Sequence, residues 1–258
     1  MKALRFTLII PLLLFAISCK KSANNPTASV TTDEAMDMAV GAISANSFGF
    51  ASVADNISAN AQNVNSVNGG GQAVNSTGTA SVHQACGTTV ADSLNFNGSN
   101  SAVTFTAFYK YMRTLNCNAN NQPDNLINSI TFHGSFDGPR LSSTDSGTST
   151  VTIGGLSSSA TNFVINGTYT RNGAFNSKVG SKASGNSTVV ITASNVTLSK
   201  PGRAVVSGSA VITVSGTAPS GAFNFTGNLV FNGNNQATLT IGTNVYLVNL
   251  LTGAYTKK

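Results

Sequence analysis

Side chains that could act as general acids, general bases or metal ligands are few and unevenly placed along this chain of 258 residues. Residues 146–258 contain no Asp, Glu, His or Cys, so the titratable side chains there are Lys, Arg and Tyr. The eight carboxylates therefore all lie earlier, at Asp33, Glu34, Asp37, Asp55, Asp92, Asp124, Asp137 and Asp145. A catalytic pair or a hard metal site would need at least two of them close together.

The most suggestive group lies in the stretch 136–145, which holds Asp137, Arg140 and Asp145 within one expected connection between strands. The alternative is an ordinary turn, in which Asp137 caps its own backbone and Arg140 pairs with a neighbour. His133 precedes this stretch, but no Gly-x-Ser-x-Gly motif at a strand-to-helix turn supports a serine nucleophile. We therefore expect no enzyme activity, no metal site and no cofactor.

The first residues have the pattern of an export signal. Lys2 and Arg5 precede an apolar run over 6–17 that is too short to span a membrane, which predicts a signal peptide over 1–18. A small residue, Ser18, is then followed directly by Cys19 and two lysines. This Ser-Cys-Lys-Lys segment resembles the lipobox of bacterial lipoproteins, in the form common in Bacteroidota.

The resemblance implies cleavage before Cys19 and acylation of both its sulfur and its new amino group. Two or more acyl chains give stable membrane anchoring, and residues 19–32 would be the lipidated cysteine and a flexible tether. The implied location is the cell envelope, most simply the outer membrane, on its periplasmic face or at the cell surface. The alternative is an ordinary signal peptide with an incidental cysteine. The rest of the chain resembles uncharacterised β-rich envelope lipoproteins.

If Cys19 carries lipid, two cysteines remain in an oxidising compartment, Cys86 and Cys117. An even number of cysteines in an exported protein predicts a disulfide between them. A metal or catalytic role is less favoured, because neither lies in a Cys-x-x-Cys spacing and only His83 is a nearby ligand.

Residues 33–90 are predicted to form a helical and loop segment that packs on a sheet. Thr31 and Glu34 match a capping box at the start of a helix expected over 33–45. A second, weaker helical pattern covers 51–62 and is followed by a polar, glycine-rich loop over 63–80.

Residues 91–258 alternate between apolar and polar side chains in long runs separated by Gly, Asn, Pro or Ser. The fold class is therefore mainly β: a long-stranded antiparallel meander that forms a curved sheet or a barrel, with one or two short N-terminal helices. Strands are expected from about residue 94 onward, with runs near 103–117, 127–136, 148–153, 161–171, 187–198, 203–215, 222–232, 236–241 and 244–251. Four of them carry a glycine on the predicted buried face, at Gly134, Gly167, Gly208 and Gly227, which predicts bends or room for large neighbours.

Only 9% of the residues are charged, and the formal net charge is +6. No cluster of Lys and Arg interleaved with aromatic residues is present, which argues against a nucleic-acid partner. Two functions fit this composition. In the first, a lipid-anchored envelope protein of structural or interaction type contacts the membrane through its acyl chains and envelope proteins or glycans through its surface. In the second, a lipocalin-like curved sheet binds an apolar small molecule. The residues that would line its pocket are Phe132, Phe136, Tyr169, Phe225 and Phe231.

Overall fold

A computed structural model describes residues 29–64, 84–99 and 103–258. Two helices, α1 (Thr32–Ile43) and α2 (Phe50–Val64), flank a short 3-10 turn, η1 (Ala45–Ser47). The eleven strands that follow are β1 (Thr89–Ser99), β2 (Thr104–Cys117), β3 (Pro123–Asp137), β4 (Leu141–Gly154), β5 (Asn162–Ser177), β6 (Ser184–Ser199), β7 (Val205–Ala218), β8 (Gly221–Gly233), β9 (Gln236–Ile241), β10 (Asn244–Asn249) and β11 (Tyr255–Lys257). The predicted signal peptide and most of the tether lie outside the described residues, as does most of the loop expected over 63–80.

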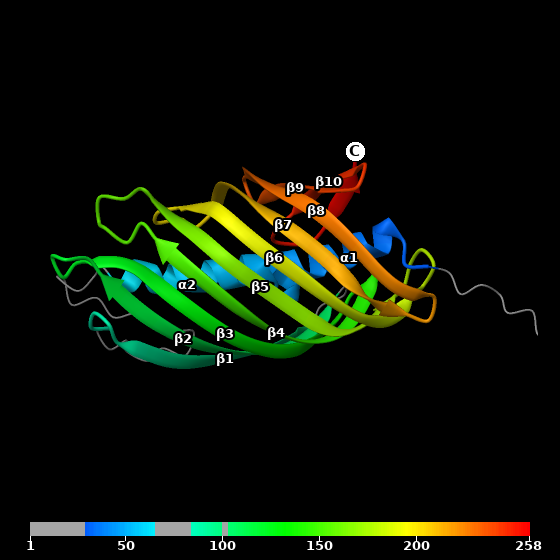
Figure 1. The fold of residues 1–258 in the computed structure, drawn as a ribbon, viewed down its shortest axis with the longest axis horizontal. Helices are drawn as coiled ribbons and strands as arrows, with labels where there is room; N and C mark the ends of the chain where they lie inside the picture. Colours follow the sequence, from blue (N-terminus) through cyan, green and yellow to red (C-terminus); the bar gives the residue numbers. More distant parts are fainter. Residues whose placement is uncertain (1–28, 65–83, 100–102) are drawn as a thin grey trace, which may run out of the picture.

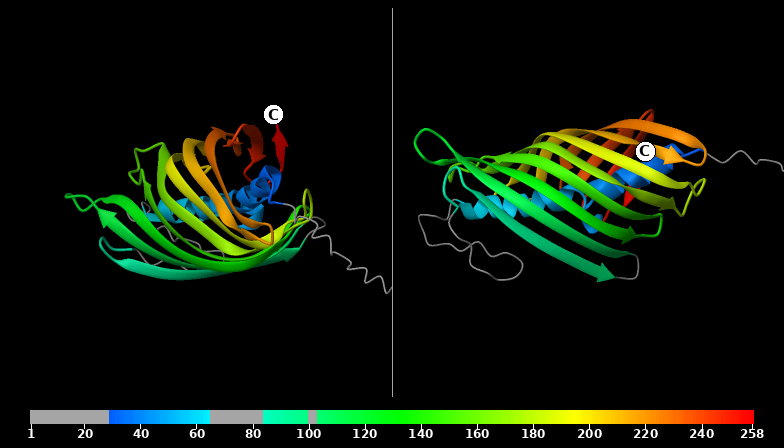
Figure 2. Two further views of the ribbon diagram at one scale, coloured as in Figure 1. Left: turned by 45° about the vertical axis from the view of Figure 1, so that its right-hand side comes forward. Right: turned by 60° about the horizontal axis from the view of Figure 1, so that its bottom comes forward.

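All eleven strands belong to one sheet, and each pairs antiparallel with its neighbours in sequence. This order confirms the predicted meander. Strands β1 and β11 are the two edges and do not pair with each other in the described part of the chain, so the sheet is open. The ribbon curls into a trough whose two sides rise around the helices (Figures 1 and 2). Of the two predicted forms, the fold is therefore the curved sheet.

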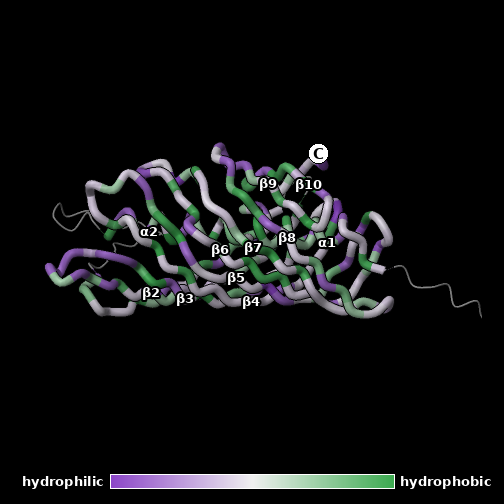
Figure 3. The backbone as a smooth tube through the Cα atoms, turned by 45° about the horizontal axis from the view of Figure 1, so that its top comes forward, coloured by the Kyte–Doolittle hydropathy of each residue, from purple (hydrophilic) through white to green (hydrophobic). Residues whose placement is uncertain are grey.

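Several strands are longer than their apolar pattern indicates. Strand β4 begins at Leu141, whereas the apolar pattern predicts a start at 148. The pattern misses the first half of the strand because that half is made mostly of Ser, Thr and Asp. These residues nevertheless pair with β3 and β5 in unbroken register. The tube in Figure 3 shows apolar positions recurring along β5 to β8 between polar ones, as expected for strands with one buried face. Polar side chains on both faces of β4 weaken that signal.

The bends in the sheet coincide with glycines on its inner face. Gly167 and Gly208 have φ angles of 145° and 121°, which favour glycine, and both lie at or beside shifts in strand register. A Cβ atom on Gly167 would also lie 2.2 Å from the Thr150 carbonyl oxygen on the neighbouring strand. Two of the four glycines therefore lie at irregularities of the strand pairing.

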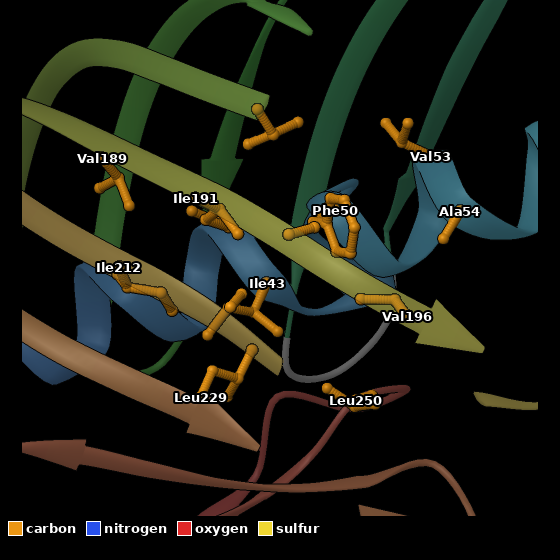
Figure 4. Packing of buried hydrophobic residues seen from close by; sticks show 14 of the residues in the cluster. Ile43, Phe50, Val53, Ala54, Val189, Ile191, Val196, Ile212, Leu229 and Leu250 are labelled. Atoms are coloured by element: carbon orange, nitrogen blue, oxygen red, sulfur yellow. The ribbon is translucent and has the colours of Figure 1, made fainter. Parts of the chain in front are cut away.

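The trough is filled by the two helices, which bury their apolar sides against the inner faces of the strands (Figure 4). Helix α1 begins with the predicted capping box, in which Thr31 and Glu34 bond each other's backbone N–H groups. Ile43 on α1 and Phe50 on α2 lie fully buried over Ile191, Ile212 and Leu229 of the sheet. The hydrophobic core is therefore a helix-to-sheet interface that runs along the trough.

Candidate functional site

Three carboxylates on the first two turns of α1 attach the helix to separate parts of the sheet. Asp33 accepts a hydrogen bond from the Tyr246 hydroxyl on β10 at 2.7 Å, beside Lys257 at 4.0 Å. Glu34 accepts from the Ser181 hydroxyl at 2.6 Å and from the Ala183 N–H at 2.9 Å. The sequence explains Glu34 as part of a capping box. The structure adds a second role, because Asp33 and Glu34 also bond to residues that follow in the chain by 147 positions or more.

The electrostatics of Glu34 follow from these bonds. The residue is 1% exposed, and burial by itself raises the pKa of a carboxyl group. Hydrogen bonds from Ser181, Thr31 and Ala183 to the ionised form outweigh that effect and lower the pKa of Glu34 below its ordinary value. The charged carboxylate is therefore the form that the fold stabilises.

Asp37, Arg140 and Tyr255 form a cluster between α1, the β3–β4 turn and β11. Oδ1 of Asp37 accepts hydrogen bonds from Nε of Arg140 and from the Tyr255 hydroxyl, both at 2.7 Å. The guanidinium carbon of Arg140 lies 5.3 Å from the centre of the Tyr255 ring. The hydrogen bond to Asp37 is the main cause of a raised pKa of Arg140, and burial followed by the same carboxylate raises the pKa of Tyr255.

The second oxygen of Asp37 is left without a partner. Its side chain is 3% exposed, and Oδ2 is buried with no hydrogen-bond partner among the described residues. A buried ionised oxygen that accepts no hydrogen bond carries an uncompensated desolvation cost. The Arg140 side chain, in contrast, is 46% exposed.

A cavity of about 580 Å³ opens beside this cluster, and Asp37, Arg140 and Tyr255 are part of its wall. The rest of the wall comes from α1 and the η1 turn after it, from Val103, from the β3–β4 turn with the strand ends beside it, and from the segment before β11. Val40, Phe136, Leu141 and Leu251 contribute apolar surface, and Gly41 leaves room on the helix side. This volume lies within the range of small-molecule sites in proteins.

The stretch 136–145 does not bring its charged residues together. Asp137 pairs with Lys178 at 2.5 Å, and Arg140 pairs with Asp37. Asp145 pairs with Arg171 at 2.5 Å. The three residues therefore do not form the catalytic or metal-binding group that the stretch suggested, because Asp145 lies within β4 and faces the trough, while Asp137 is exposed at the end of β3. The ordinary-turn interpretation is closer, although Asp137 pairs with Lys178 and Arg140 pairs with Asp37 on α1.

The Asp145–Arg171 pair joins the sheet to the connection between the helices. The two side chains are 8% and 10% exposed, and the Ser143 hydroxyl donates to the same Asp145 oxygen at 2.7 Å. Arg171 also donates to the carbonyl oxygens of Gly41 and Ser47 near the ends of α1 and η1. Sequence reasoning missed Arg171. The sequence does contain a signal for it, because a charged residue stands at a position where the alternation of the strand predicts an inward-facing apolar side chain.

Most of the aromatic residues predicted to line a ligand pocket belong to the helix-to-sheet core. Phe132 stacks on Tyr169 with ring centres 5.1 Å apart, and Phe50 of α2 lies 6.5 Å from Tyr169 and 6.4 Å from Phe231. Phe225 is half-buried near Phe223, at 6.3 Å.

Phe136 is the member of the predicted set that lines the 580 Å³ cavity. The packing around the other aromatic residues favours a role in the core over a role in a pocket.

The two later cysteines form the predicted disulfide. The Cα atoms of Cys86 and Cys117 are 5.6 Å apart, and the bond joins the segment before β1 to the end of β2. Cys19, the predicted lipidation site, lies outside the described residues.

The convex face of the sheet carries rows in which most side chains are hydroxyl or amide groups, with one valine in each row. One row crosses six paired strands at Thr131, Thr148, Thr170, Val190, Thr213 and Thr226. A parallel row contains Ser129, Thr150, Thr168, Thr192, Val211 and Asn228. Strands β4 to β8 hold two charged residues, Asp145 and Arg171, and both face the trough. The convex face of these five strands is therefore uncharged.

Among the residues that the structure describes, no cluster of three or more His, Cys, Asp or Glu side chains could hold a metal ion. No helix in the described ranges is long and apolar enough to cross a membrane. No known family model matches the chain, and comparisons with curated proteins and with solved structures find no match either.

Proposed function

We propose that this protein is a lipid-anchored cell-envelope protein of structural or interaction type. The anchor is Cys19, and the interaction surface is the convex face of β4 to β8. The observation that carries the proposal is that this face is broad and uncharged, with hydroxyl and amide groups in register across neighbouring strands.

The chemistry of the face favours an uncharged partner that offers many hydrogen-bonding groups. Ser, Thr and Asn side chains both donate and accept hydrogen bonds, so a regular array matches a polymer with repeated hydroxyl groups. Absence of charge removes long-range attraction to anionic polymers, including nucleic acids. A neutral envelope glycan is therefore the preferred partner, and an envelope protein is the competing one.

The interaction is tested with a variant that adds charge to the face without touching the core. Thr148→Lys, Thr168→Lys and Thr213→Lys place three cations on outward positions of β4, β5 and β7. Neutral polysaccharide isolated from the native envelope should be retained by the wild-type protein on beads and lost by this variant.

A matched control carries the same added charge on exposed loop residues, as Asn120→Lys, Ser158→Lys and Ser220→Lys. It should retain the polysaccharide as the wild type does. Equal retention by all three proteins would contradict the assignment of the convex face, and recovery of one reproducible protein in place of glycan would identify the competing partner.

The anchor needs a separate test. Labelling of growing cells with a fatty-acid analogue should mark the wild-type protein and leave Cys19→Ala unmarked. A labelled Cys19→Ala variant, or an unlabelled wild type, would favour an ordinary signal peptide.

A further inference from the structure

We propose that β1 pairs edge to edge with β1 of a second copy of this chain, antiparallel and about a two-fold axis, so that the two curved sheets join into one. The inference goes beyond the proposed envelope function and depends neither on the lipid anchor nor on a glycan. It rests on the free backbone edge of β1, on the contrast between the two edges of the sheet, and on a strand sequence that is compatible with pairing to itself.

Strand β1 forms one rim of the trough (Figures 1 and 2). All eleven of its residues pair with β2, from Thr89 opposite Thr114 to Ser99 opposite Thr104. Along its other side, no strand within the described ranges pairs with it. A long free edge presents a row of backbone N–H and C=O groups, and the chain that can bond to such a row is another extended strand.

The ladder between β1 and β2 shows which backbone groups face the free edge. The N–H of Leu115 donates to the carbonyl oxygen of Thr88 at 3.2 Å, in the same register as the rest of the pair. In an antiparallel ladder, residues that bond to the neighbouring strand alternate with residues that point away from it. The odd-numbered residues of β1, among them Ala91, Asn95 and Asn97, therefore direct their N–H and C=O groups to the free edge.

The two edges of the sheet differ in how they resist the addition of a strand. Strand β11, at the opposite edge, has three residues, and the side chain of Lys257 on it is 52% exposed. Short edge strands and lysine side chains are common features that prevent edge-to-edge pairing. Strand β1 has eleven residues, contains no Lys, Arg or Pro, and runs along β2 without a shift in register. Of the two edges, β1 is therefore the one that accepts another strand.

The charges on β1 permit pairing with an identical strand. Asp92 is the one charged residue of the strand, and Arg113 of β2 balances it at 3.8 Å. The Asp92 side chain also accepts from the N–H of Ser93 at 2.7 Å, so one donor of the edge is used within the strand. With the two-fold axis at Asn95, Asp92 lies opposite Gly98 of the second copy. No like charges meet across the interface in this register.

The same register brings apolar side chains together on the trough side. Leu94 and Phe96 face inward and are half-buried, and each lies opposite the other in the second copy. Phe96 also packs on Phe48 with ring centres 4.7 Å apart, which holds the aromatic side chain in place before the copies meet. A second copy supplies a strand of the same length with this matching pattern, so it is preferred over a strand of another protein.

The test uses two full-length copies with different C-terminal tags, co-expressed and purified through one tag from detergent-solubilised cells. Wild-type copies should co-purify. Asn95→Lys with Asn97→Lys, carried by both copies, sets lysines against each other and should lower recovery of the second copy about fivefold or more. The matched control, Thr192→Lys with Ser194→Lys, adds the same charge to exposed residues of β6 and should co-purify as the wild type does.

A charge-reversal pair distinguishes a second copy from a strand of another protein. When one copy carries the two lysines and the other carries Asn95→Glu with Asn97→Glu, opposite charges face each other and co-purification should return. This return also shows that the lysine variant is folded. Wild-type copies that do not co-purify, lysine copies that co-purify as the wild type does, or a lysine and glutamate pair that fails to restore recovery would overturn the proposal.

Discussion

Replacement of Arg171 by Met removes one half of the buried ion pair that joins the sheet to the helix connection. The remaining Asp145 carboxylate is 8% exposed, so it is left as an unpaired charge away from water. Loss of one partner of such a pair costs about 3–5 kcal/mol. The carbonyl oxygens of Gly41 and Ser47 also lose a donor. The free energy of unfolding of a folded domain is about 5–15 kcal/mol, so the variant should lose a large part of its stability.

The assay is equilibrium unfolding in urea, followed by circular dichroism at two wavelengths, with the free energy of unfolding extrapolated to water. The matched control is Lys178→Met, which breaks the pair with Asp137, where the two side chains are 38% and 60% exposed. An exposed pair contributes about 0–1 kcal/mol, so this control should change stability little.

A double variant, Arg171→Met with Asp145→Leu, should recover most of the loss, because it removes both charges together. If Arg171→Met destabilises the protein no more than Lys178→Met does, or if the double variant is less stable than the single one, the reasoning from burial is refuted.

Three further predictions concern the disulfide, the helix and the pH dependence. Cys86→Ser with Cys117→Ser opens a loop with a sequence separation of 31 and should lower the free energy of unfolding by about 3–4 kcal/mol, and the wild type under reducing conditions should match it. Gly41→Ala should raise the thermal midpoint, since alanine favours a helix over glycine by about 0.5–1 kcal/mol and its Cβ meets only an ordinary contact; an unchanged or lower midpoint would contradict this. The pKa of Glu34 is lower in the folded state than its ordinary value of 4.5, so its stabilising effect is present above about pH 4.5 and is lost as the pH falls through the folded value. The stability difference between wild type and Glu34→Gln should accordingly shrink in acid titrations, and a difference that grows below pH 4 would refute the assignment.

The parts of the fold that the sequence predicts are those set by local pattern. Thr31 and Glu34 mark the start of α1 because a capping box is a short-range arrangement, and the alternating strands from β5 to β10 are visible because one face of each is apolar. β11 was not predicted, because three residues with two exposed side chains have no period to detect. The sequence could not decide between an open curved sheet and a closed barrel. Whether the two edge strands meet depends on the twist and bend accumulated over the whole sheet, which no local pattern records.

The candidate site is less visible in the sequence, because its residues come together only through tertiary structure. Arg140 and Tyr255 lie 103 and 218 positions after Asp37, and no spacing rule connects the three residues. Asp145 and Arg171 depend on strand register, which places Gly147 opposite Arg171 and brings Asp145 within reach. The disulfide could be predicted because the inference rests on an even number of cysteines in an oxidising compartment, and not on geometry.

The position of α1 inside the trough has a consequence for the order in which the molecule forms. Each hairpin of the meander pairs strands that are adjacent in the chain, so the sheet grows by local steps with small loop-closure cost. The helix is made first, yet its partners Tyr246 and Tyr255 belong to the last strands, 213 and 218 positions away. During synthesis its apolar side therefore meets β5 to β7 first, whereas Asp33 and Asp37 receive their tyrosine partners only when the chain is nearly complete. Loss of the last dozen residues would take Tyr255 from Asp37 and leave the helix packed on β5 to β7, so the end of the chain completes the polar attachment of a helix that earlier strands already hold.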